Sequence, residues 1–308
     1  MNQINKEENF ISAVVYCYNN AGVIGKFVQG LHKALDKHFK KYEIVVVNDA
    51  STDGCIKEVR EYASGQQNLV LSVLNMSYHQ GQEASMNAGV DLSIGDFVYE
   101  FDSICEDFGW ELMYYIYRHS LEGYDIVSAR RDEKPDFMSR VYYRLFNKYA
   151  HLPFNVGVET FRLVSRRAIN RVYSMTQTIP FRKAAYANSG LNLDVIEYRA
   201  ITEGEKKSPQ RLAGVVDSLI LFTDVAYRIT LGLALFMFVL FLAFVIYAVV
   251  YRILSNPVEG WTTTVIFSSI GFSGLFAILA MVIKYLQTLV QLVFKKKDYI
   301  FESIEKLQ

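Results

Sequence analysis

The chain has 308 residues, enough for one α/β domain of ordinary size together with a membrane-embedded segment. Its 32 basic and 32 acidic residues give a formal net charge of +0, which argues against a general nucleic-acid-binding protein, because such proteins usually carry a basic excess. The three cysteines match neither a zinc site nor a disulfide framework, and the polar start MNQINKEENF is unlike a signal peptide.

The first hundred residues alternate short apolar runs with helical patterns. Apolar runs of strand length predict β-strands at 11–18, 42–47, 69–74 and 96–101. Apolar residues at helical spacing predict one helix over 21–39 and another that carries Ile56, Val59 and Tyr62. A further strand is predicted at 124–128, and Ser139-Arg140 opens another helix. This alternation indicates an α/β domain with a mostly parallel, Rossmann-like sheet.

Polar residues cluster directly after the predicted strands, where open α/β sheets bind their ligands. The clearest cluster is Asn48-Asp49-Ala50-Ser51-Thr52-Asp53-Gly54, which follows the strand at 42–47. The chain has neither a GxGxxG motif nor a P-loop, which excludes an ordinary dinucleotide or P-loop site.

Two long segments near the C-terminus carry no charged side chain. They are the 23 residues from 229 to 251, long enough to span about 30 Å of hydrocarbon, and residues 260–283. A soluble helix of this length needs a polar face, so these segments predict two transmembrane helices joined by a tight connection at 252–259.

Basic residues predict the orientation of this hairpin. They cluster before the first helix (Lys206, Lys207, Arg211) and after the second (Lys295–Lys297), whereas the connection holds only Arg252, so both termini are predicted to be cytoplasmic. The predicted parts are a cytosolic domain (1–207), an interfacial helix (208–228), the transmembrane region (229–285) and a cytosolic tail (286–308). An amphipathic helix packed on the soluble domain is the alternative for 208–228.

The order of several motifs resembles that of family 2 glycosyltransferases with a GT-A fold. These motifs are YNN at 18–20, NDASTDG at 48–54, HQGQEASMNAG at 79–89, an Asp-containing turn at 102–107, FRL at 161–163 and GEKKS at 204–208. The chain is similar in particular to the polyprenyl-phosphate branch, which contains dolichol-phosphate mannose synthases and undecaprenyl-phosphate glycosyltransferases. The resemblance implies transfer of a sugar from a nucleotide-sugar donor to a polyprenyl phosphate at the cytoplasmic face of the inner membrane, for cell envelope glycan biosynthesis.

The resemblance also implies a donor site at the ends of the first strands. It assigns nucleotide and donor contacts to Tyr18, Asn19, Asp49, Asp53 and Gln82. The Asp49 carboxylate would accept hydrogen bonds from the base or the ribose. The alternative for this loop is a local Asx turn that caps the next helix through Asp53.

The turn at 102–107 departs from the metal motif of the family. Relatives read DxD, extended to DxDxQ in this branch, whereas this chain has Asp102, Ile104 and Glu106 at the three positions. One interpretation is a relocated Mg²⁺ or Mn²⁺ site on Asp102 and Glu106. The other is a decayed site that binds metal weakly or not at all.

A second departure precedes Phe161, where relatives often have Asp and this chain has Glu159 and Thr160. A lipid phosphate is already mostly ionised at neutral pH, with a second pKa near 6, so it needs orientation more than a base. We therefore predict Asp102, Glu106 and Glu159 as the catalytic carboxylates.

Basic residues are candidates for holding the two phosphate groups. By resemblance, Arg130 and Lys207 face the donor diphosphate, whereas Arg140, with Arg131, faces the lipid phosphate. Solvated surface charge is the alternative for each of them.

Two other functions compete with the leading one. A non-catalytic paralogue that acts as a membrane scaffold or partner would explain Ile104 and Thr160. A processive polysaccharide synthase is disfavoured, because the chain lacks a QxxRW motif and has too few predicted membrane helices. The sequence does not decide the sugar, the nucleotide or the oligomeric state, and it is compatible with a homo-oligomer.

Overall fold

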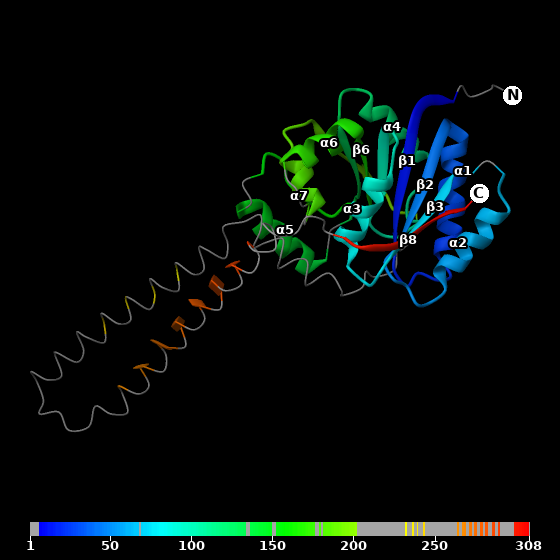
Figure 1. Cartoon of the computed structure of the whole chain (residues 1–308). Helices are drawn as coiled ribbons and strands as arrows, with labels where there is room; N and C mark the ends of the chain where they lie inside the picture. The colour runs from blue at the N-terminus through cyan, green and yellow to red at the C-terminus, as the bar shows by residue number, and fades with distance from the viewer. Residues whose placement is uncertain are drawn as a thin grey trace, which may run out of the picture. The chain divides into compact units, whose positions relative to one another are not determined.

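A computed structural model describes residues 6–67, 69–133, 136–149, 152–175, 179, 181–201 and 299–307, together with isolated helical positions between 232 and 289. The chain divides into two compact units. The first contains Met1–Asn147, Leu152–Pro209 and Lys296–Gln308, and the second contains Lys148–His151 and Gln210–Lys295. Figure 1 traces the chain from the N-terminus in blue to the C-terminus in red.

The described part of the first unit is built on one eight-stranded sheet in the order β7-β5-β6-β4-β1-β2-β3-β8. The strands are β1 (Glu7–Cys17), β2 (Phe39–Asn48), β3 (Leu71–Met76), β4 (Phe97–Phe101), β5 (Ile126–Arg131), β6 (Phe161–Ser165), β7 (Leu193–Tyr198) and β8 (Phe301–Leu307). Strands β1 to β4 run parallel to one another, as do β5 and β7, whereas β6 and β8 are antiparallel to their neighbours. The predicted α/β domain with a mostly parallel sheet is confirmed.

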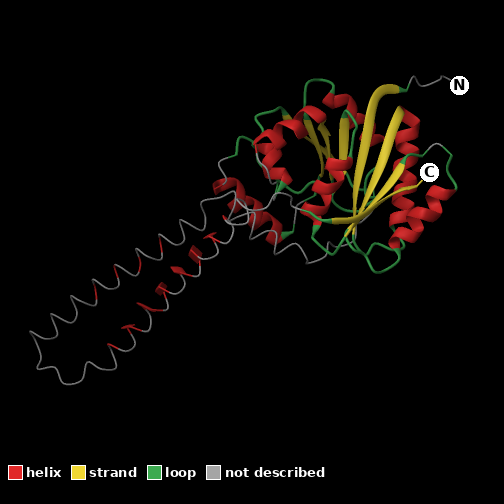
Figure 2. Cartoon of the chain, in the orientation of Figure 1, coloured by secondary structure: helices red, strands yellow, loops and turns green. Residues whose placement is uncertain are grey.

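Helices cover both faces of this sheet, as Figure 2 shows. One face packs against α1 (Ile24–His38), α2 (Cys55–Ser64) and α4 (Glu111–Ser120), and the other against α3 (Gln82–Leu92), α6 (Arg166–Met175) and α7 (Arg182–Ala187). A further helix, α5, spans Phe137–Tyr149. Because both faces are covered, the central strands are mostly apolar, and residues 11–15 of β1 are all buried.

The observed elements differ from the predicted ones mainly at their ends. Strand β1 begins at Glu7, four residues before the predicted start, because it continues along β2 beyond the apolar run. Strand β5 extends to Arg131, so Arg130 and Arg131 lie inside a strand and not after it. The helix predicted from Ser139 begins at Phe137.

The C-terminal residues form a strand where the sequence predicts only a tail. Strand β8 pairs antiparallel with β3. Arg60 of α2 donates two hydrogen bonds to Glu305 of β8, at 3.0 and 2.9 Å. The Ile300 amide donates to Gln80 Oε1 at 2.9 Å, just before β8 begins. The chain therefore leaves the first unit and returns to it as an edge strand.

The predicted membrane segments fall mostly outside the described residues. Those residues include none of the interfacial helix 208–228 and only isolated positions of the spans 229–251 and 260–283. Among the positions that are described, no helix has both the length and the apolar character needed to cross a membrane. Large apolar side chains at helical positions of this region are nevertheless exposed, at Phe272, Leu275, Leu279, Val282, Leu286 and Leu289.

We predict that Gly89→Ala destabilises the first unit by about 1–3 kcal/mol, because a side chain there overpacks the contact of α3 with the sheet. A Cβ atom at Gly89 would lie 2.5 Å from Val47 Cγ2 and would also clash with Val14. The control is Gly65→Ala, where the nearest atom, Tyr62 O, is 3.6 Å away. Chemical denaturation followed by circular dichroism measures both variants, and equal midpoints would contradict the packing described here.

Candidate functional site

The loops that follow β1 and β2 lie side by side at one edge of the sheet, because the two strands are parallel. The Asn19 amide donates to Ser51 Oγ at 3.1 Å, and the Thr52 amide donates to Asn19 Oδ1 at 2.9 Å. The Ala21 amide donates to Asp53 Oδ2 at 2.7 Å. Hydrogen bonds thus join the two loops, which contain Asn19 and Asp53, two of the predicted donor-site residues.

Two non-glycine residues in these loops have left-handed backbone conformations. The φ angles of Asn19 and Ala50 are 50° and 56°. Such conformations cost on the order of 1–3 kcal/mol each and persist where the surrounding structure enforces them, most often at binding and active sites. This edge of the sheet is therefore the candidate site for a ligand.

Asp49 is fully buried, and its carboxylate organises the neighbouring loop. Oδ1 accepts the Gln80 amide at 2.8 Å, and Oδ2 accepts the Gly81 amide at 2.9 Å and the Tyr16 hydroxyl at 3.0 Å. His79 Nδ1 lies 2.9 Å from the same oxygen. The carboxylate that was predicted to contact the nucleotide therefore shapes residues 79–81 directly before α3.

The local turn that the sequence offered as an alternative is also present, at Asp53. Its Oδ1 accepts the Cys55 amide at 3.0 Å, while Gly54 occupies the N-cap of α2. Tyr18, another predicted donor-site residue, stacks on His79 with ring centroids 4.0 Å apart. Gln82 is the first residue of α3 at the same edge.

Asp102 follows β4 and lies in a buried network of charged side chains. Arg162 Nη2 donates to Asp102 Oδ2, and Arg182 Nη2 donates to Asp102 Oδ1 at 2.7 Å. Arg162 also donates to Glu100 Oε2 at 2.6 Å and to Glu159 Oε2 at 3.0 Å. Asp102 and Glu159, two of the three predicted catalytic carboxylates, therefore accept hydrogen bonds from the same guanidinium group, that of Arg162.

Arg182 of α7 completes this network from the other side. Its Nε donates to Glu100 Oε2 at 3.1 Å, and its Nη1 donates to the Glu83 carbonyl oxygen at 3.1 Å. The Tyr186 hydroxyl donates to Glu100 Oε1. The side chains of Arg162 and Arg182 are only 2% and 1% exposed, so these ion pairs are shielded from water.

Burial and charge compete at Asp102. Burial alone would raise the pKa of the Asp102 carboxyl, but the charges of Arg162 and Arg182 hold that pKa well below its usual range. At Glu83 burial prevails and raises the pKa despite Arg182. Removing one partner from a buried ion pair typically costs about 3–5 kcal/mol, so the network fixes β4, β6 and α7 relative to one another.

The sequence contained a signal for this network that the prediction did not use. Glu100 interrupts the apolar strand FVYEF, and Arg162 interrupts FRLVS. A charge inside a buried strand needs a partner of opposite charge. Arg182 and Glu83 carry no comparable signal, because only the fold brings α7 and α3 beside β4.

The described residues do not fit the predicted divalent cation. Both oxygens of Asp102 accept hydrogen bonds from guanidinium groups. Ile104 packs against the hydrophobic core, whereas Glu106 is exposed in the turn. Within the described part of the chain, no group of three or more His, Cys, Asp or Glu side chains is placed to hold a metal ion. The relocated site on Asp102 and Glu106 therefore gains no support from the geometry.

Arg130 and Arg131 have different environments because successive residues of a strand point to opposite faces. Arg131 forms an ion pair with Asp107, whose side chain is fully buried and also accepts the Tyr198 hydroxyl at 3.0 Å. This pair gives Arg131 a structural role that the sequence prediction did not include. Arg130 Nε, in contrast, is buried and has no hydrogen-bond partner among the described residues. Its guanidinium packs on Gly157, where a Cβ atom would lie 2.8 Å from Nη2.

Thr160, at the position where relatives often have Asp, is bonded inside the protein. Its Oγ1 lies 2.6 Å from the Tyr198 hydroxyl, and its amide donates to the Ala129 carbonyl at 2.8 Å. Glu159 beside it is held by Arg162. Neither side chain is therefore arranged as an unengaged general base.

Arg140 is exposed on α5, a helix with a basic and an apolar face. Phe137, Val141 and Leu145 are exposed at 65%, 37% and 39%, and their spacing of four residues places them on one stripe. Arg140, Arg144 and Lys148 are also exposed and are likewise four residues apart. Arg140 and Arg144 directly precede Val141 and Leu145, so the basic side chains form a second stripe beside the apolar one. The predicted Lys207 lies outside the described residues.

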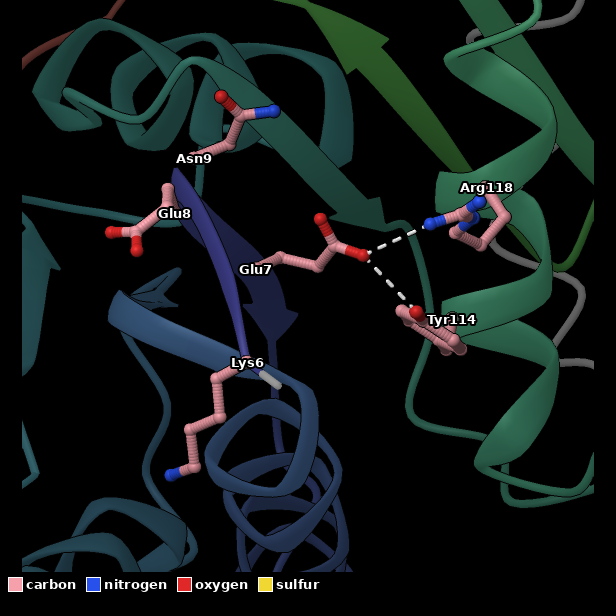
Figure 3. Close-up of a pocket in the computed structure, with 6 residues that line it drawn as sticks. All are labelled: Lys6, Glu7, Glu8, Asn9, Tyr114 and Arg118. Carbon is pink, nitrogen blue, oxygen red and sulfur yellow. Dashed lines mark hydrogen bonds and ion pairs between the residues drawn. The ribbon is translucent and has the colours of Figure 1, made fainter. Parts of the chain in front are cut away.

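The first unit also has a pocket elsewhere, which Figure 3 shows in close-up. It is lined by Lys6, Glu7, Glu8, Asn9, Tyr114 and Arg118. Glu7 accepts hydrogen bonds from Tyr114 at 3.1 Å and from Arg118 at 3.2 Å. The pocket lies at the amino end of β1, opposite the loops described above, so it is not the candidate site.

Comparison with known proteins identifies the family. Residues 12–173 match the sequence profile of glycosyl transferase family 2. The chain belongs to this family. The putative glycosyltransferase CsbB of Bacillus subtilis is 26% identical over 87% of this chain and 83% of that protein. The prophage bactoprenol glucosyl transferase homolog of Escherichia coli is 25% identical over 61% of this chain and 62% of that protein.

A solved structure shows the same fold in a more distant protein. The mannosyltransferase PcManGT from Pyrobaculum calidifontis, in complex with GDP-Man and Mn²⁺, aligns with a TM-score of 0.52 and 16% identity. The alignment covers 72% of this chain and 65% of that chain. The first unit of this family 2 glycosyltransferase therefore has a GT-A-like fold, as the motifs predicted.

We predict that Arg131→Ala destabilises the protein much more than Arg130→Ala does, although the two residues are adjacent in β5. Arg131→Ala leaves the buried Asp107 carboxylate without its ion-pair partner and should cost about 3 kcal/mol of unfolding free energy. Arg130→Ala removes a guanidinium with no described ion pair and should change stability by no more than about 0.5 kcal/mol. Chemical denaturation midpoints measure the stability of both variants. A large loss of stability in Arg130→Ala would contradict the absence of an ion pair at Arg130.

Proposed function

We propose that this glycosyltransferase moves a sugar from a nucleotide-sugar donor to a polyprenyl phosphate, such as undecaprenyl phosphate, at the cytoplasmic face of the cell membrane. Family membership supports the sugar transfer. The lipid acceptor is supported by the names of the relatives, which include bactoprenol glucosyl transferases and, at 29% identity over 42% of this chain, an undecaprenyl-phosphate 4-deoxy-4-formamido-L-arabinose transferase of Proteus mirabilis.

Helix α5 is the observation that carries the lipid acceptor. Its exposed apolar stripe (Phe137, Val141, Leu145) runs beside the basic residue Arg140. Apolar side chains suit the hydrocarbon of a prenyl chain, and a guanidinium binds a phosphate in bidentate fashion. In this proposal Arg140 holds the lipid phosphate, as the sequence predicts.

The same proposal places residues 229–251 and 260–283 in the membrane as a helical hairpin. The exposed apolar stripe from Phe272 to Leu289 supports it, because such a surface is unfavourable in water. Strand β8 adds a topological argument. The return of the chain to β3 after these segments supports an even number of membrane crossings, as in a hairpin. In this proposal the basic residues at the outer ends favour a cytoplasmic location for the GT-A unit and for both termini.

The reaction requires little acid–base chemistry from the protein. An ionised oxygen of the lipid phosphate forms the new bond to the anomeric carbon while the bond from that carbon to the nucleoside diphosphate breaks. The lipid phosphate needs no base, because it is already mostly anionic at neutral pH. Arg130 is suited to face the departing diphosphate, because its side chain is partly exposed and forms no ion pair with a described residue.

The test is incubation of the full-length protein with undecaprenyl phosphate and a panel of nucleotide sugars, followed by mass spectrometry of the lipids. One sugar should yield a lipid heavier by one hexose-type residue, and Arg130→Ala should lower its yield. A scaffold without activity is the competing hypothesis, favoured by Ile104, which packs against the core, and by Thr160, which is bonded to Tyr198. No lipid product with any donor would favour the scaffold.

We predict that Arg140→Ala weakens acceptor use about ten- to hundredfold while donor affinity stays unchanged, because a lost charge-assisted hydrogen bond costs about 1.5–3 kcal/mol. The matched control is Arg144→Ala, one turn later on the same exposed face, which should change either constant less than about twofold. Acceptor KM in detergent micelles and nucleotide affinity by calorimetry measure the two effects. Equal losses for donor and acceptor would contradict the assignment of Arg140.

A further inference from the structure

The carboxylate of Asp102 is fully engaged inside the protein. One oxygen accepts a hydrogen bond from Arg162 Nη2 and the other accepts one from Arg182 Nη2 at 2.7 Å. A metal ion would have to share oxygens that already face two positive charges, or it would have to displace a guanidinium group. Asp102 is only 6% exposed, so water does little to screen this repulsion.

The two guanidinium groups are themselves held in place by other carboxylates. Arg162 is bonded to Glu100 and Glu159, and Arg182 is bonded to Glu100 and to the backbone of Glu83. Moving either arginine away from Asp102 would break several of these buried contacts together. The other carboxylates therefore hold both guanidinium groups at Asp102, and a metal ion would not displace them easily.

The neighbouring positions offer no replacement for Asp102 as a ligand. Ile104 has a hydrocarbon side chain that packs against the core, and Asp107 is fully buried and paired with Arg131. Glu106 is exposed at the surface of the turn. A single exposed carboxylate is a weak site for a divalent cation, which prefers several oxygen ligands.

We propose that Arg162 and Arg182 occupy Asp102 in place of a divalent cation, so that this chain binds its nucleoside diphosphate without one. The part of the inference that concerns the nucleotide rests on the function proposed above. The charge that faces the diphosphate comes instead from fixed side chains, of which Arg130 is the described candidate at the same sheet edge. Its side chain is partly exposed and forms no ion pair with a described residue, so its charge can face a phosphate.

The first experiment measures Mn²⁺ itself. Free Mn²⁺ is titrated against the full-length protein by electron paramagnetic resonance, with and without UDP or GDP. We expect the same weak binding for wild type and for Asp102→Asn in every condition. A Mn²⁺ site that Asp102→Asn weakens more than tenfold would overturn the proposal. This readout does not depend on sugar transfer, so it stands apart from the lipid assay that tests the proposed function.

The second experiment compares UDP and GDP binding by calorimetry in EDTA and in Mn²⁺. We expect the dissociation constant of the nucleotide that binds to agree within about twofold between the two conditions, because no metal contact is made or lost. Tighter binding by more than tenfold in Mn²⁺ would overturn the proposal. If neither nucleotide binds in EDTA but one binds in Mn²⁺, the proposal is likewise overturned.

A pair of variants tests the role of the arginines directly. Ile104→Asp restores the carboxylate of the family motif but leaves Asp102 bonded to both guanidinium groups, so it should create no Mn²⁺ site. The double variant Ile104→Asp with Arg182→Gln loosens Asp102 and should gain Mn²⁺ binding at least tenfold over Ile104→Asp alone. Circular dichroism checks that both variants fold, and Ile104→Asp is decisive by itself, because strong Mn²⁺ binding in that variant would show that Asp102 was available.

Discussion

Two buried arginines, Arg162 and Arg182, join three segments of the chain around Asp102. Arg162 comes from β6 and Arg182 from α7, and both are bonded to Glu100 and Asp102 at the end of β4. Unpaired charges are very costly at this depth, so every member of the network depends on the others. The same contacts that hold the GT-A-like unit together at this edge also determine which side chains remain for a ligand.

A second set of contacts connects the edge that contains the candidate site to residues next to strand β8. Asp49 accepts the amides of Gln80 and Gly81, and the Gln80 side chain is bonded in turn to the backbone of Ile300, just before β8. The loop that precedes α3 is therefore held from both sides. Residues that follow the proposed membrane hairpin thus help to fix the loop at the edge that contains the candidate site.

Much of this could be predicted from sequence, because strands buried on both faces and loops at their carboxyl ends leave periodic and compositional signals. The parallel core and the grouping of Asn19 with Asp53 follow from such signals, whereas the family is predicted from the resemblance of several motifs to those of its members. The hydrogen bond between Arg182 and Asp102 could not be predicted in this way. Arg182 lies 80 residues from Asp102 in the sequence, and only the fold brings the two side chains together. Strand β8 is missed for a similar reason: its alternating, partly exposed pattern becomes a strand only by pairing with β3.

The most direct test of this account is an experimental structure of the full chain with a bound nucleotide sugar and Mn²⁺ present, with anomalous scattering used to locate manganese. The account predicts that Asp102 keeps its bonds to Arg162 and Arg182, that no manganese lies at Asp102, and that Arg130 contacts the diphosphate. A manganese ion coordinated by Asp102, with either arginine displaced, would contradict it.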